Sequence, residues 1–470
     1  MGSTLEDDTL KKKTEDQYLS DVVVIGSGNA GLSAAATAAE KGAYVIILEK
    51  RKNIGGNTII SGGVYNAVDP KRQQYQNIFD SKELHFGQTL KGGDFKGDQE
   101  LVWILVDRAL EGLQWLEKNG MKFQEHVFTI VGGIWPRSHQ PIEPAGTGYI
   151  KTLKRLCFSL GVRILTGYRA EKLLYRKGRV MGVRCRDLQG KEFLFWAKKG
   201  VILATGGFSA NVQMRSRYNP LLNDIIPTTN QPGATGDGIL MGMEIGAAVT
   251  GMEYIQLNPY CEPKTGRLQT ILTGAVEHLI YVNNEGNRFV DEGERRDVIA
   301  DAFLRQKNAT AYLINDSQDE FVQKGITHFG KTPEELIKKG HVIKGDTLEE
   351  LANKIRVPFE NLIRSIEKYN KSVELGYDSD FGRTLLKYKI ERPPFYACPR
   401  VPAVHYTMGG LKINTKAQVL DGKGKPISGL FAAGEVVGGI HGANRLGGNA
   451  ITETIVFGRI AGESVVRGLD

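Results

Sequence analysis

The sequence contains few cysteines, and their spacing argues against several kinds of prosthetic group. Only four occur in 470 residues, namely Cys157, Cys185, Cys261 and Cys398. None belongs to a CxxC or CxxCH motif, which disfavours structural zinc, iron–sulfur ligation and covalently attached haem. The scarcity of thiols fits a reducing compartment without requiring one.

Long apolar segments are also missing. No apolar run reaches the roughly 18 residues of a membrane span. The polar N-terminus, residues 1–21, has no apolar core of the kind found in signal peptides. We therefore expect a cytoplasmic protein without a membrane span, or a periplasmic one if a leader peptide has been removed.

Charge of one sign does not gather in any single region. The net charge is +8, but the densest basic run, LKKKTED at residues 10–16, is interrupted by acids. This pattern predicts a polar N-terminal tail, which we place at residues 1–19, and disfavours a nucleic-acid-binding patch. A cationic surface could still steer small anions or an acidic redox partner towards the protein.

Glycine, in contrast, is abundant and clustered. Within DVVVIGSGNAGLSAAATAAEKGAYVIILEK (residues 21–50), Gly26, Gly28 and Gly31 separate a buried strand from a helix of small residues, and a second strand ends at Glu49. The glycines allow a tight turn and the close approach of a pyrophosphate, while the carboxylate accepts hydrogen bonds from ribose hydroxyls. The segment therefore predicts a Rossmann-type dinucleotide site.

Three further glycine-rich segments extend this prediction. IGGNTIISGG (54–63) is either a plain loop or, as we favour, a second segment that contacts the nucleotide. KKGVILATGGF (198–208) and ISGLFAAGEVVGG (427–439) are buried strands that run into glycines. They predict one sheet assembled from both ends of the chain, interrupted by an inserted α+β domain at about 250–390.

The stretch IHGANRLGGNAITET (440–454) places Arg445 among small residues, just before a helix that we expect to begin near Asn449. A guanidinium group suits a carboxylate or a phosphate. The N–H groups at the start of a helix also attract negative charge. This stretch therefore predicts contacts with two electron-rich groups.

Four strings in one order resemble a known family. GGNTIISGG (55–63), GNRFVDEGERRD (286–297), VHYTMGG (404–410) and GEVVGGIHGANRLGGNAI (434–451) are similar to motifs of the fumarate reductase/succinate dehydrogenase flavoprotein family. The likeness is strongest to its soluble branch, the flavocytochrome fumarate reductases, urocanate reductases and related enoate reductases. It runs from about residue 20 to residue 467.

The resemblance implies an α/β fold, with a Rossmann-like FAD-binding domain of the GR2 type and an inserted α+β capping domain. We expect the FAD-binding domain at residues 20–249 and 391–470, and the capping domain at residues 250–390. A cleft between two such domains is a common place for a ligand.

The resemblance also implies FAD as the cofactor. The residues it assigns to FAD are Gly26, Gly28, Asn29, Ala30, Gly31, Glu49, Lys50, Gly55, Gly56, Asn57, Thr58, Ser61, Gly62, Gly63, Ala170, Thr205, Gly206, Asp237, Gly434, Glu435, Asn449, Ala450 and Ile451. The membrane-bound branch attaches FAD through a histidine near the paired glycines. Here Asn57 and Thr58 occupy that segment, and no histidine occurs before residue 85. We therefore expect noncovalent FAD.

For catalysis, the resemblance implies that His405 and Arg445 hold a substrate carboxylate and that Arg296 protonates the α-carbon. Arginine is normally too basic to donate a proton, so an ion pair of Arg296 with Asp297 or Glu294 is the structural alternative. Arg295 is a nearer-surface candidate in the same motif. We interpret Arg288 as structural.

Three positions depart from the fumarate reductase pattern. Asn258 replaces a histidine that helps to hold the second carboxylate, Thr273 and Gly274 replace a Thr-Glu pair, and Glu277 replaces an arginine. An uncharged amide and an added carboxylate disfavour a dianion in a desolvated site. The proton relay would also need to be rebuilt, through Glu277 or His278.

The sequence therefore predicts an FAD-dependent reductase of a small α,β-unsaturated carboxylic acid. A monocarboxylate such as a urocanate-, cinnamate- or acrylate-like acid fits best. The alternatives are a fumarate reductase, a ketosteroid-type dehydrogenase and a noncatalytic flavin electron carrier. Because no haem motif or second nucleotide motif is recognisable, we expect a separate electron donor, either a cytochrome, a flavoprotein or a reductase subunit.

Overall fold

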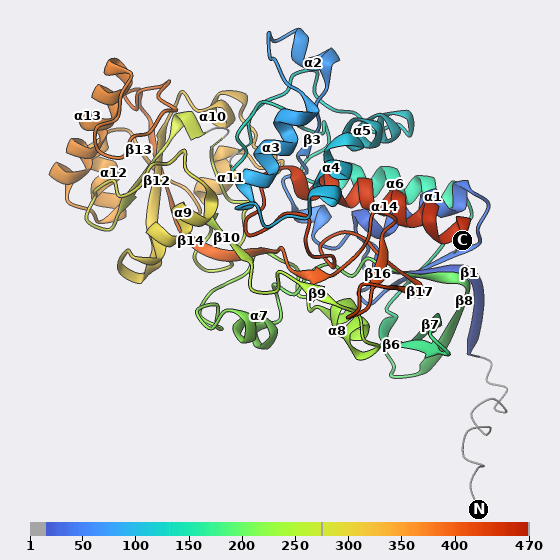
Figure 1. Ribbon diagram of the computed structural model, residues 1–470. Helices are drawn as coiled ribbons and strands as arrows, with labels where there is room; N and C mark the ends of the chain where they lie inside the picture. Colours follow the sequence, from blue (N-terminus) through green and yellow to red (C-terminus); the bar gives the residue numbers. More distant parts are fainter. Residues whose placement is uncertain (1–15, 131, 274–275, 469–470) are drawn as a thin grey trace, which may run out of the picture.

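The computed structural model describes residues 16–130, 132–273 and 276–468 (Figure 1). The structure has two main parts, each built on one large sheet, at the two sides of Figure 1. Helix α14 (Asn449–Arg467) crosses the larger part. The fold is mixed α/β, as predicted.

The larger sheet has eight strands and is built from both ends of the chain. Its order is β16-β17-β7-β8-β1-β2-β5, with β6 paired to β7. The strands are β1 (Gln17–Ile25), β2 (Val45–Glu49), β5 (Arg163–Thr166), β6 (Arg169–Arg176), β7 (Arg179–Arg186), β8 (Glu192–Leu203), β16 (Gln418–Leu420) and β17 (Pro426–Ala432). The central β1 pairs in parallel with β2 and β8, and β17 pairs in parallel with β8. The predicted assembly of one sheet from distant segments is confirmed.

The first strand begins earlier than expected. Residues 17–19, which we placed in the polar tail, belong to β1 and pair with Leu194, Phe195 and Trp196 of β8. Tyr18 stacks on Phe195 with ring centroids 4.7 Å apart. Aromatic packing therefore extends the strand into a segment whose composition is polar.

Two helices of small residues pack closely beside this sheet. Helix α1 (Asn29–Glu40) lies against α14, where a Cβ added at Gly458 or Gly462 would lie 2.8 or 2.4 Å from backbone oxygens of α1. Only glycine permits such an approach. The helix predicted to begin near Asn449 is thus held directly against the dinucleotide motif.

Several short elements surround these layers. They are β3 (Tyr65–Asn66), α2 (Pro70–Gln74), α3 (Lys82–Gly92), α4 (Gln99–Asp107), α5 (Ala109–Lys118), β4 (Ser138–His139), α6 (Thr147–Ser159), α7 (Val212–Tyr218), α8 (Asp237–Glu244), β9 (Val249–Thr250) and β15 (Gly410–Leu411). The segment 54–63, expected to hold no helix, contains a single 3-10 turn at Thr58–Ile60.

The second sheet is antiparallel and forms the other part of the molecule. Its order is β10-β14-β12-β11, with β13 paired to β14. Its strands are β10 (Ile255–Cys261), β11 (Ile280–Asn283), β12 (Ala311–Asp316), β13 (Ile343–Gly345) and β14 (Phe395–Thr407). Strand β14 belongs to this sheet although it lies beyond residue 390, where we ended the capping domain. The domain limits themselves remain a prediction.

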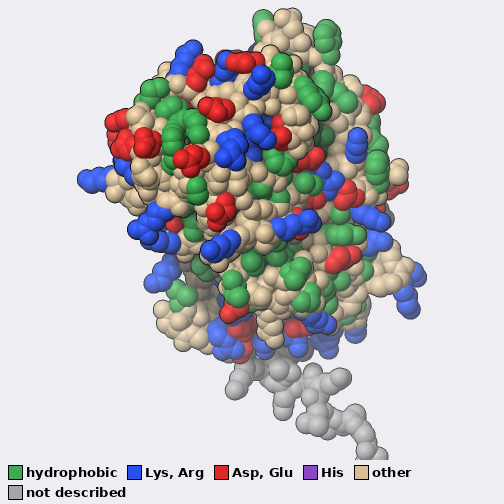
Figure 2. All heavy atoms as spheres, turned by 90° about the vertical axis from the view of Figure 1, so that its left-hand side faces the viewer, with side chains coloured by type: hydrophobic (Ala, Val, Ile, Leu, Met, Phe, Trp, Pro, Cys, Tyr) green, Lys and Arg blue, Asp and Glu red, His purple; other side chains and the backbone are tan. Residues whose placement is uncertain are grey.

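Helices cover this second sheet. They are α9 (Arg296–Leu304), α10 (Glu320–Lys324), α11 (Pro333–Lys338), α12 (Leu348–Ile355) and α13 (Phe359–Leu375). Helices α12 and α13 are separated at Arg356, whose φ is 58°, just before Pro358. On the face of the molecule next to α12 and α13, basic and acidic side chains are interspersed (Figure 2).

Candidate functional site

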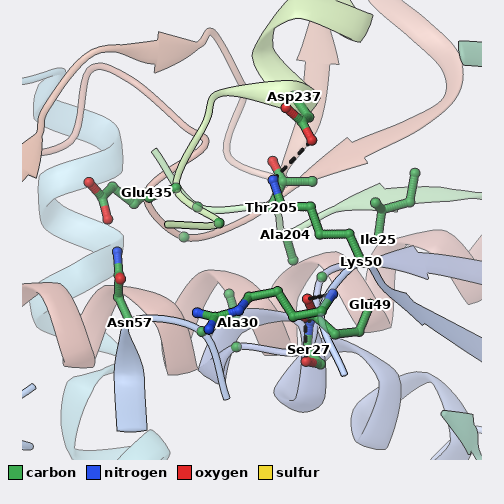
Figure 3. A pocket seen from close by; sticks show the side chains of 18 of the residues that line it. Ile25, Ser27, Ala30, Glu49, Lys50, Asn57, Ala204, Thr205, Asp237 and Glu435 are labelled. Carbon is green, nitrogen blue, oxygen red and sulfur yellow. Dashed lines mark hydrogen bonds and ion pairs between the residues drawn. The ribbon is translucent and has the colours of Figure 1, made fainter. Parts of the chain in front are cut away.

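A first cavity lies at the carboxyl ends of β1, β2 and β8, where parallel strands commonly present a ligand site. At one end, Glu49 accepts hydrogen bonds from the backbone N (3.1 Å) and hydroxyl (2.6 Å) of Ser27 and from the backbone N of Arg51 (2.9 Å). Asn57 and Glu435 lie at the other end (Figure 3). The cavity is therefore elongated, with a fixed carboxylate where a ribose is expected.

Gly26, Gly28 and Gly31 of the first motif are each glycine for a different structural reason. Gly26 has a φ of 105°, and a Cβ there would lie 2.2 Å from the oxygen of Ala204. A Cβ at Gly31 would lie 2.0 Å from the oxygen of Gly26. At Gly28 the nearest atom would be Oγ1 of Thr58, at 3.9 Å. Gly28 thus keeps space at the cavity wall, which fits a pyrophosphate approaching the backbone.

Lys50 and Asp237 close another side of the first cavity. The Lys50 ammonium lies 3.0 Å from the Asp237 carboxylate (Figure 3). The carboxylate also accepts a hydrogen bond from Thr235. Burial alone would raise the pKa of Asp237, but Lys50, Thr235 and Arg169 together hold that pKa below its usual value. The carboxylate therefore stays charged beside the cavity.

Most residues predicted to bind FAD line one of two cavities. Those on the first are Gly26, Gly28, Asn29, Ala30, Glu49, Lys50, Gly56, Asn57, Thr58, Ala170, Thr205, Gly206, Asp237, Gly434 and Glu435. Those on the second are Asn57, Thr58, Ser61, Gly62, Gly63, Glu435, Ala450 and Ile451. Gly31, Gly55 and Asn449 line neither. The side chain of Asn449 is instead hydrogen-bonded to Asn66, His85 and Thr89.

The second cavity has a volume of about 560 Å³ and continues from the first, because both are lined by Asn57, Thr58, Glu435 and Thr454. The start of α14 reaches it through Ala450 and Ile451. The predicted catalytic and substrate-binding residues that line it are Asn258, Thr273, Arg296, His405 and Arg445. Gly274, also predicted to bind substrate, lies outside the described residues.

Arg445 is a buried cation in the wall of this cavity. Its Nη2 donates to Oε1 of Gln256 (2.9 Å), its Nη1 donates to the oxygen of Leu446 (3.0 Å), and its guanidinium lies 4.8 Å from the ring centroid of Tyr406. Burial, together with the charge of Arg296, lowers the pKa of Arg445 to about 9. Within the described ranges, Arg445 forms no ion pair and its Nε has no hydrogen-bond partner.

His405 lies on β14, and its Nδ1 is 2.8 Å from Oγ1 of Thr229. Burial, with the nearby charges of Arg445 and Arg296, lowers the pKa of His405 well below its usual value. The imidazole is therefore neutral near pH 7. Of this pair, Arg445 therefore brings the positive charge.

Arg296 begins α9 and is buried beside Tyr260, Cys261 and Tyr281. Burial lowers its pKa below the usual arginine value. Asp297, one of the partners considered for Arg296, forms an ion pair with Arg295 (2.7 Å), which also contacts Asp94 (2.5 Å).

The remaining candidates, Arg288, Glu277 and His278, differ in their surroundings. Arg288 forms buried ion pairs with Glu292 (2.8 Å) and Asp378 (2.9 Å), in keeping with a structural role. Of the two relay candidates, Glu277 lines the second cavity. The ring of His278 packs on Tyr388 with centroids 3.8 Å apart and does not line that cavity.

Sequence reasoning missed several residues of these walls. Ser27 and Arg51, which hold Glu49, could have been found as neighbours of the glycine motif and the acid. Gln256, which orients Arg445, precedes Asn258 in a string already singled out. Thr229 carries no sequence signal, because the fold brings it to His405 from a distant loop.

Comparisons with known proteins decide the family. A family model described as an FAD binding domain matches residues 21–451. The NADH:acrylate oxidoreductase of Vibrio harveyi is 41% identical over 94% of this chain and 50% of its own length. The urocanate reductase of Eggerthella lenta is 39% identical over 94% of this chain and 74% of its own length. The chain belongs to the fumarate reductase/succinate dehydrogenase flavoprotein family.

A solved structure supports the same assignment for this flavoprotein. The open conformation of a flavocytochrome c3 fumarate reductase superimposes with a TM-score of 0.80 and 35% identity, covering 99% of this chain and 81% of that one. The predicted family and fold are thus confirmed. It spans about half the length of the Vibrio harveyi relative.

The described residues contain neither a membrane-spanning helix nor a cluster of metal ligands. No helix in the described ranges is both long and apolar enough to cross a membrane. Among the same residues, no group of three or more His, Cys, Asp or Glu side chains could hold a metal ion.

Proposed function

We propose that this flavoprotein reduces the C=C bond of an α,β-unsaturated monocarboxylate. The observation that carries the proposal is Arg445, a buried guanidinium in the cavity wall that forms no ion pair among the described residues. The carboxylates of Glu435 and Glu453 act on it only from beyond ion-pair distance. A buried charge is costly unless it is paired, so a substrate carboxylate would supply the missing partner. Relatives named for acrylate, urocanate and fumarate reduction support this substrate class.

The residues present fit FAD. Glu49 offers a fixed acceptor for a ribose, and Gly28 keeps room for the pyrophosphate. Ala450 and Ile451, at the start of α14, lie in the second cavity, where their N–H groups would face the flavin ring. When bound and reduced, FAD supplies the hydride that the β-carbon of the substrate receives.

The chain's own residues then account for the rest of the reaction. Arg445 and the neutral His405 hold the carboxylate, and the guanidinium stabilises the negative charge that builds on it. Arg296 donates a proton to the α-carbon. Its burial, which lowers its pKa, makes that donation easier than from an exposed arginine. Glu277, the relay candidate in the cavity wall, would return a proton to Arg296.

The far end of the cavity disfavours a second carboxylate. The hydroxyl of Thr273 donates to Oδ2 of Asp319 (2.8 Å), whose carboxylate is fully buried. Oδ1 of Asn258 accepts a hydrogen bond from the backbone N of Tyr260 (2.9 Å), and Glu277 lines the same cavity. Acidic groups at or behind this wall would repel the second charge of fumarate.

The experiment that tests this function uses the FAD-loaded protein, reduced anaerobically with dithionite and mixed with a panel of acceptors. The panel contains acrylate, cinnamate, urocanate, fumarate and a 3-ketosteroid, and flavin absorbance reports reoxidation. We expect a monocarboxylate to exceed fumarate in kcat/KM by at least about tenfold, or about 1.4 kcal/mol. Tenfold preference for fumarate would make the flavoprotein a fumarate reductase. Reoxidation by the steroid alone would make it a ketosteroid-type dehydrogenase, and no reoxidation by any acceptor would leave an electron carrier.

We further propose that FAD is bound noncovalently. Asn57 and Thr58 occupy the segment where the membrane-bound branch has its histidine. The fold does bring one histidine near, because a Cβ added at Gly62 would lie 3.6 Å from Nε2 of His328. Acid precipitation should therefore leave FAD in the supernatant. Yellow colour retained in the washed pellet, and released in His328→Ala, would instead identify a covalent link to that residue.

Electrons would reach the flavin from a separate donor. The name of the Vibrio harveyi relative assigns its electrons to NADH, and this chain spans half of that protein. We propose that a cytochrome, flavoprotein or reductase subunit connects the physiological reductant to this flavoprotein. NADH alone should then fail to reduce the isolated, FAD-loaded chain.

A further inference from the structure

Residues 228–231 form a loop that runs beside β14 and contacts the imidazole of His405. The backbone N of Thr229 and the hydroxyl of Thr228 both donate to the oxygen of Val404, at 3.0 and 2.8 Å. Oγ1 of Thr229 lies 2.8 Å from Nδ1 of His405. The loop is therefore fixed to the strand at the residue that precedes His405.

Two backbone groups set the amide orientations of Asn57 and Asn230. The backbone N–H of Gln231 can only donate, and it donates to Oδ1 of Asn57 (2.8 Å). The oxygen end of the Asn57 amide therefore faces Gln231, and its nitrogen, Nδ2, donates to Oδ1 of Asn230. The backbone oxygen of His405 can only accept, and it accepts from Nδ2 of Asn230 (2.9 Å). Both amide orientations thus follow from the network.

The same network orients the hydroxyl of Thr229. The second hydrogen of the Asn230 amide points to Oγ1 of Thr229 (3.3 Å), since the competing oxygen of Val404 (3.4 Å) already accepts two hydrogen bonds. Among the described residues, Nδ1 of His405 is the acceptor within hydrogen-bond distance of the Thr229 hydroxyl, so we expect the hydroxyl to direct its own hydrogen there. A neutral imidazole that accepts at Nδ1 carries its proton on Nε2.

We infer that Thr229 is a positioning residue, which holds His405 in the Nε2–H tautomer and so presents an N–H donor to the substrate carboxylate. The inference rests on the proposed function for the identity of the bound group. The lowered pKa of His405 supports it, because a neutral ring has only one donor and the choice of nitrogen then decides whether it attracts or repels a carboxylate.

The chain of hydrogen bonds also links the two cavities. Asn57 lines both of them, and Asn230 and His405 line the second. The segment predicted to contact the flavin therefore orients, through two amides and one hydroxyl, a group predicted to hold the substrate.

The test reads the ring nitrogens directly, without turnover. FAD-loaded protein is prepared with 15N-labelled histidine, and the His405 signals are assigned by their loss in His405→Gln. We expect Nε2 to be protonated and Nδ1 to give the signal of a hydrogen-bonded, unprotonated nitrogen. In Thr229→Val the Nδ1 signal should move to the position of an unbonded nitrogen, whereas Thr229→Ser should resemble the wild type. Thr228→Val frees the oxygen of Val404 for the second Asn230 hydrogen but leaves Nδ1 its hydroxyl partner, so it should shift the ring signals less than Thr229→Val.

Binding of the saturated acid that would be the product provides the second measurement, read from flavin absorbance. Thr229→Val should raise the Kd of this acid by about tenfold, as expected for one hydrogen bond that orients a donor. In Thr229→Ser the Kd should stay within about threefold of the wild-type value. A protonated Nδ1 in the wild type would overturn the inference. So would equal effects of Thr228→Val and Thr229→Val, because the loop and not the hydroxyl would then be responsible. If no enoate is reduced but Nε2 is protonated as expected, only the proposed function fails.

Discussion

Arg445 and Arg296 lie in the wall of one cavity, but their surroundings differ. Arg445 is oriented by Gln256, Leu446 and the ring of Tyr406, so its position does not depend on the substrate. Arg296 begins a helix beside Tyr260, Tyr281 and Cys261. A prealigned cation suits binding, and a buried group with a lowered pKa suits proton transfer. The two residues should therefore separate in kinetics.

Arg445→Ala should raise KM strongly and also lower kcat. The guanidinium contacts the carboxylate in the ground state and stabilises more charge in the transition state, so both quantities should change. Steady-state kinetics on the best enoate of the panel measure this. Gln256→Ala is the matched variant, since it removes only an orienting contact and should give a smaller change in the same direction. An unchanged KM in Arg445→Ala would contradict its role in holding the carboxylate.

Arg296→Ala should lower kcat by at least about 10²-fold, the usual loss for an acid–base group, while FAD content stays unchanged. Lysine at this position should restore little, because its ammonium has a different reach and geometry. Arg305→Ala is the control, because Arg305 follows the same helix and its side chain is 76% exposed. If Arg296→Ala kept more than about a tenth of wild-type kcat, the proton donor would be another residue, with Glu277 or Tyr406 to be tested next.

At the scale of elements, the turn of the dinucleotide motif serves both the packing of α1 and the room for a ligand. Gly31 lets α1 pack on the end of β1, whereas Gly28 keeps the cavity wall open. Local glycine spacing is the same signal in both cases, and only the packing shows which glycine serves the fold and which serves the ligand.

Gly28→Ala and Gly31→Ala should therefore fail in different ways. Gly28→Ala has room for its methyl group in the protein without FAD, so the melting temperature of that form should change little, while FAD affinity should fall by at least about tenfold, or about 1.4 kcal/mol. Gly31→Ala places a Cβ 2.0 Å from a backbone oxygen and should destabilise folding by about 1–3 kcal/mol. Thermal unfolding with and without FAD distinguishes them. Equal losses of stability in both variants would refute the distinction.

At the scale of the whole molecule, burial of histidine links stability to pH. Burial lowers the pKa of His85 to about 3 and of His328 to about 4, and also lowers the pKa values of His278, His405 and His441. Burial acts in the opposite sense on Glu435, whose pKa rises to about 7. Each histidine binds a proton in the unfolded chain below about pH 6.5 but not in the folded chain.

Stability should therefore fall as the pH drops below about 6.5, by about 1 kcal/mol per histidine and pH unit. Glu435 contributes in the opposite direction. Between its ordinary pKa and its folded pKa of about 7, it binds a proton in the folded chain and releases that proton on unfolding. Unfolding with guanidinium in weakly buffered solution at pH 5.5 should take up protons net, with about one each from His85 and His328. His85→Gln should take up about one fewer. Net proton release on unfolding at this pH would contradict the assignment.

The sequence by itself determined the features that depend on local pattern. The order of strand, glycines, helix and acid predicts the first cavity, and four family strings predict most of the residues that line the second. These signals are local because a backbone that approaches a phosphate needs glycine at fixed spacing. The tertiary structure decided what depends on groups distant in sequence. Burial lowers the pKa of His405, and packing pairs Asp297 with Arg295. Arg445 forms no ion pair among the described residues. The fold also brings Thr229 to His405 and His328 to Gly62. Burial and hydrogen-bond direction arise only when separate segments pack together, so no local pattern could encode them.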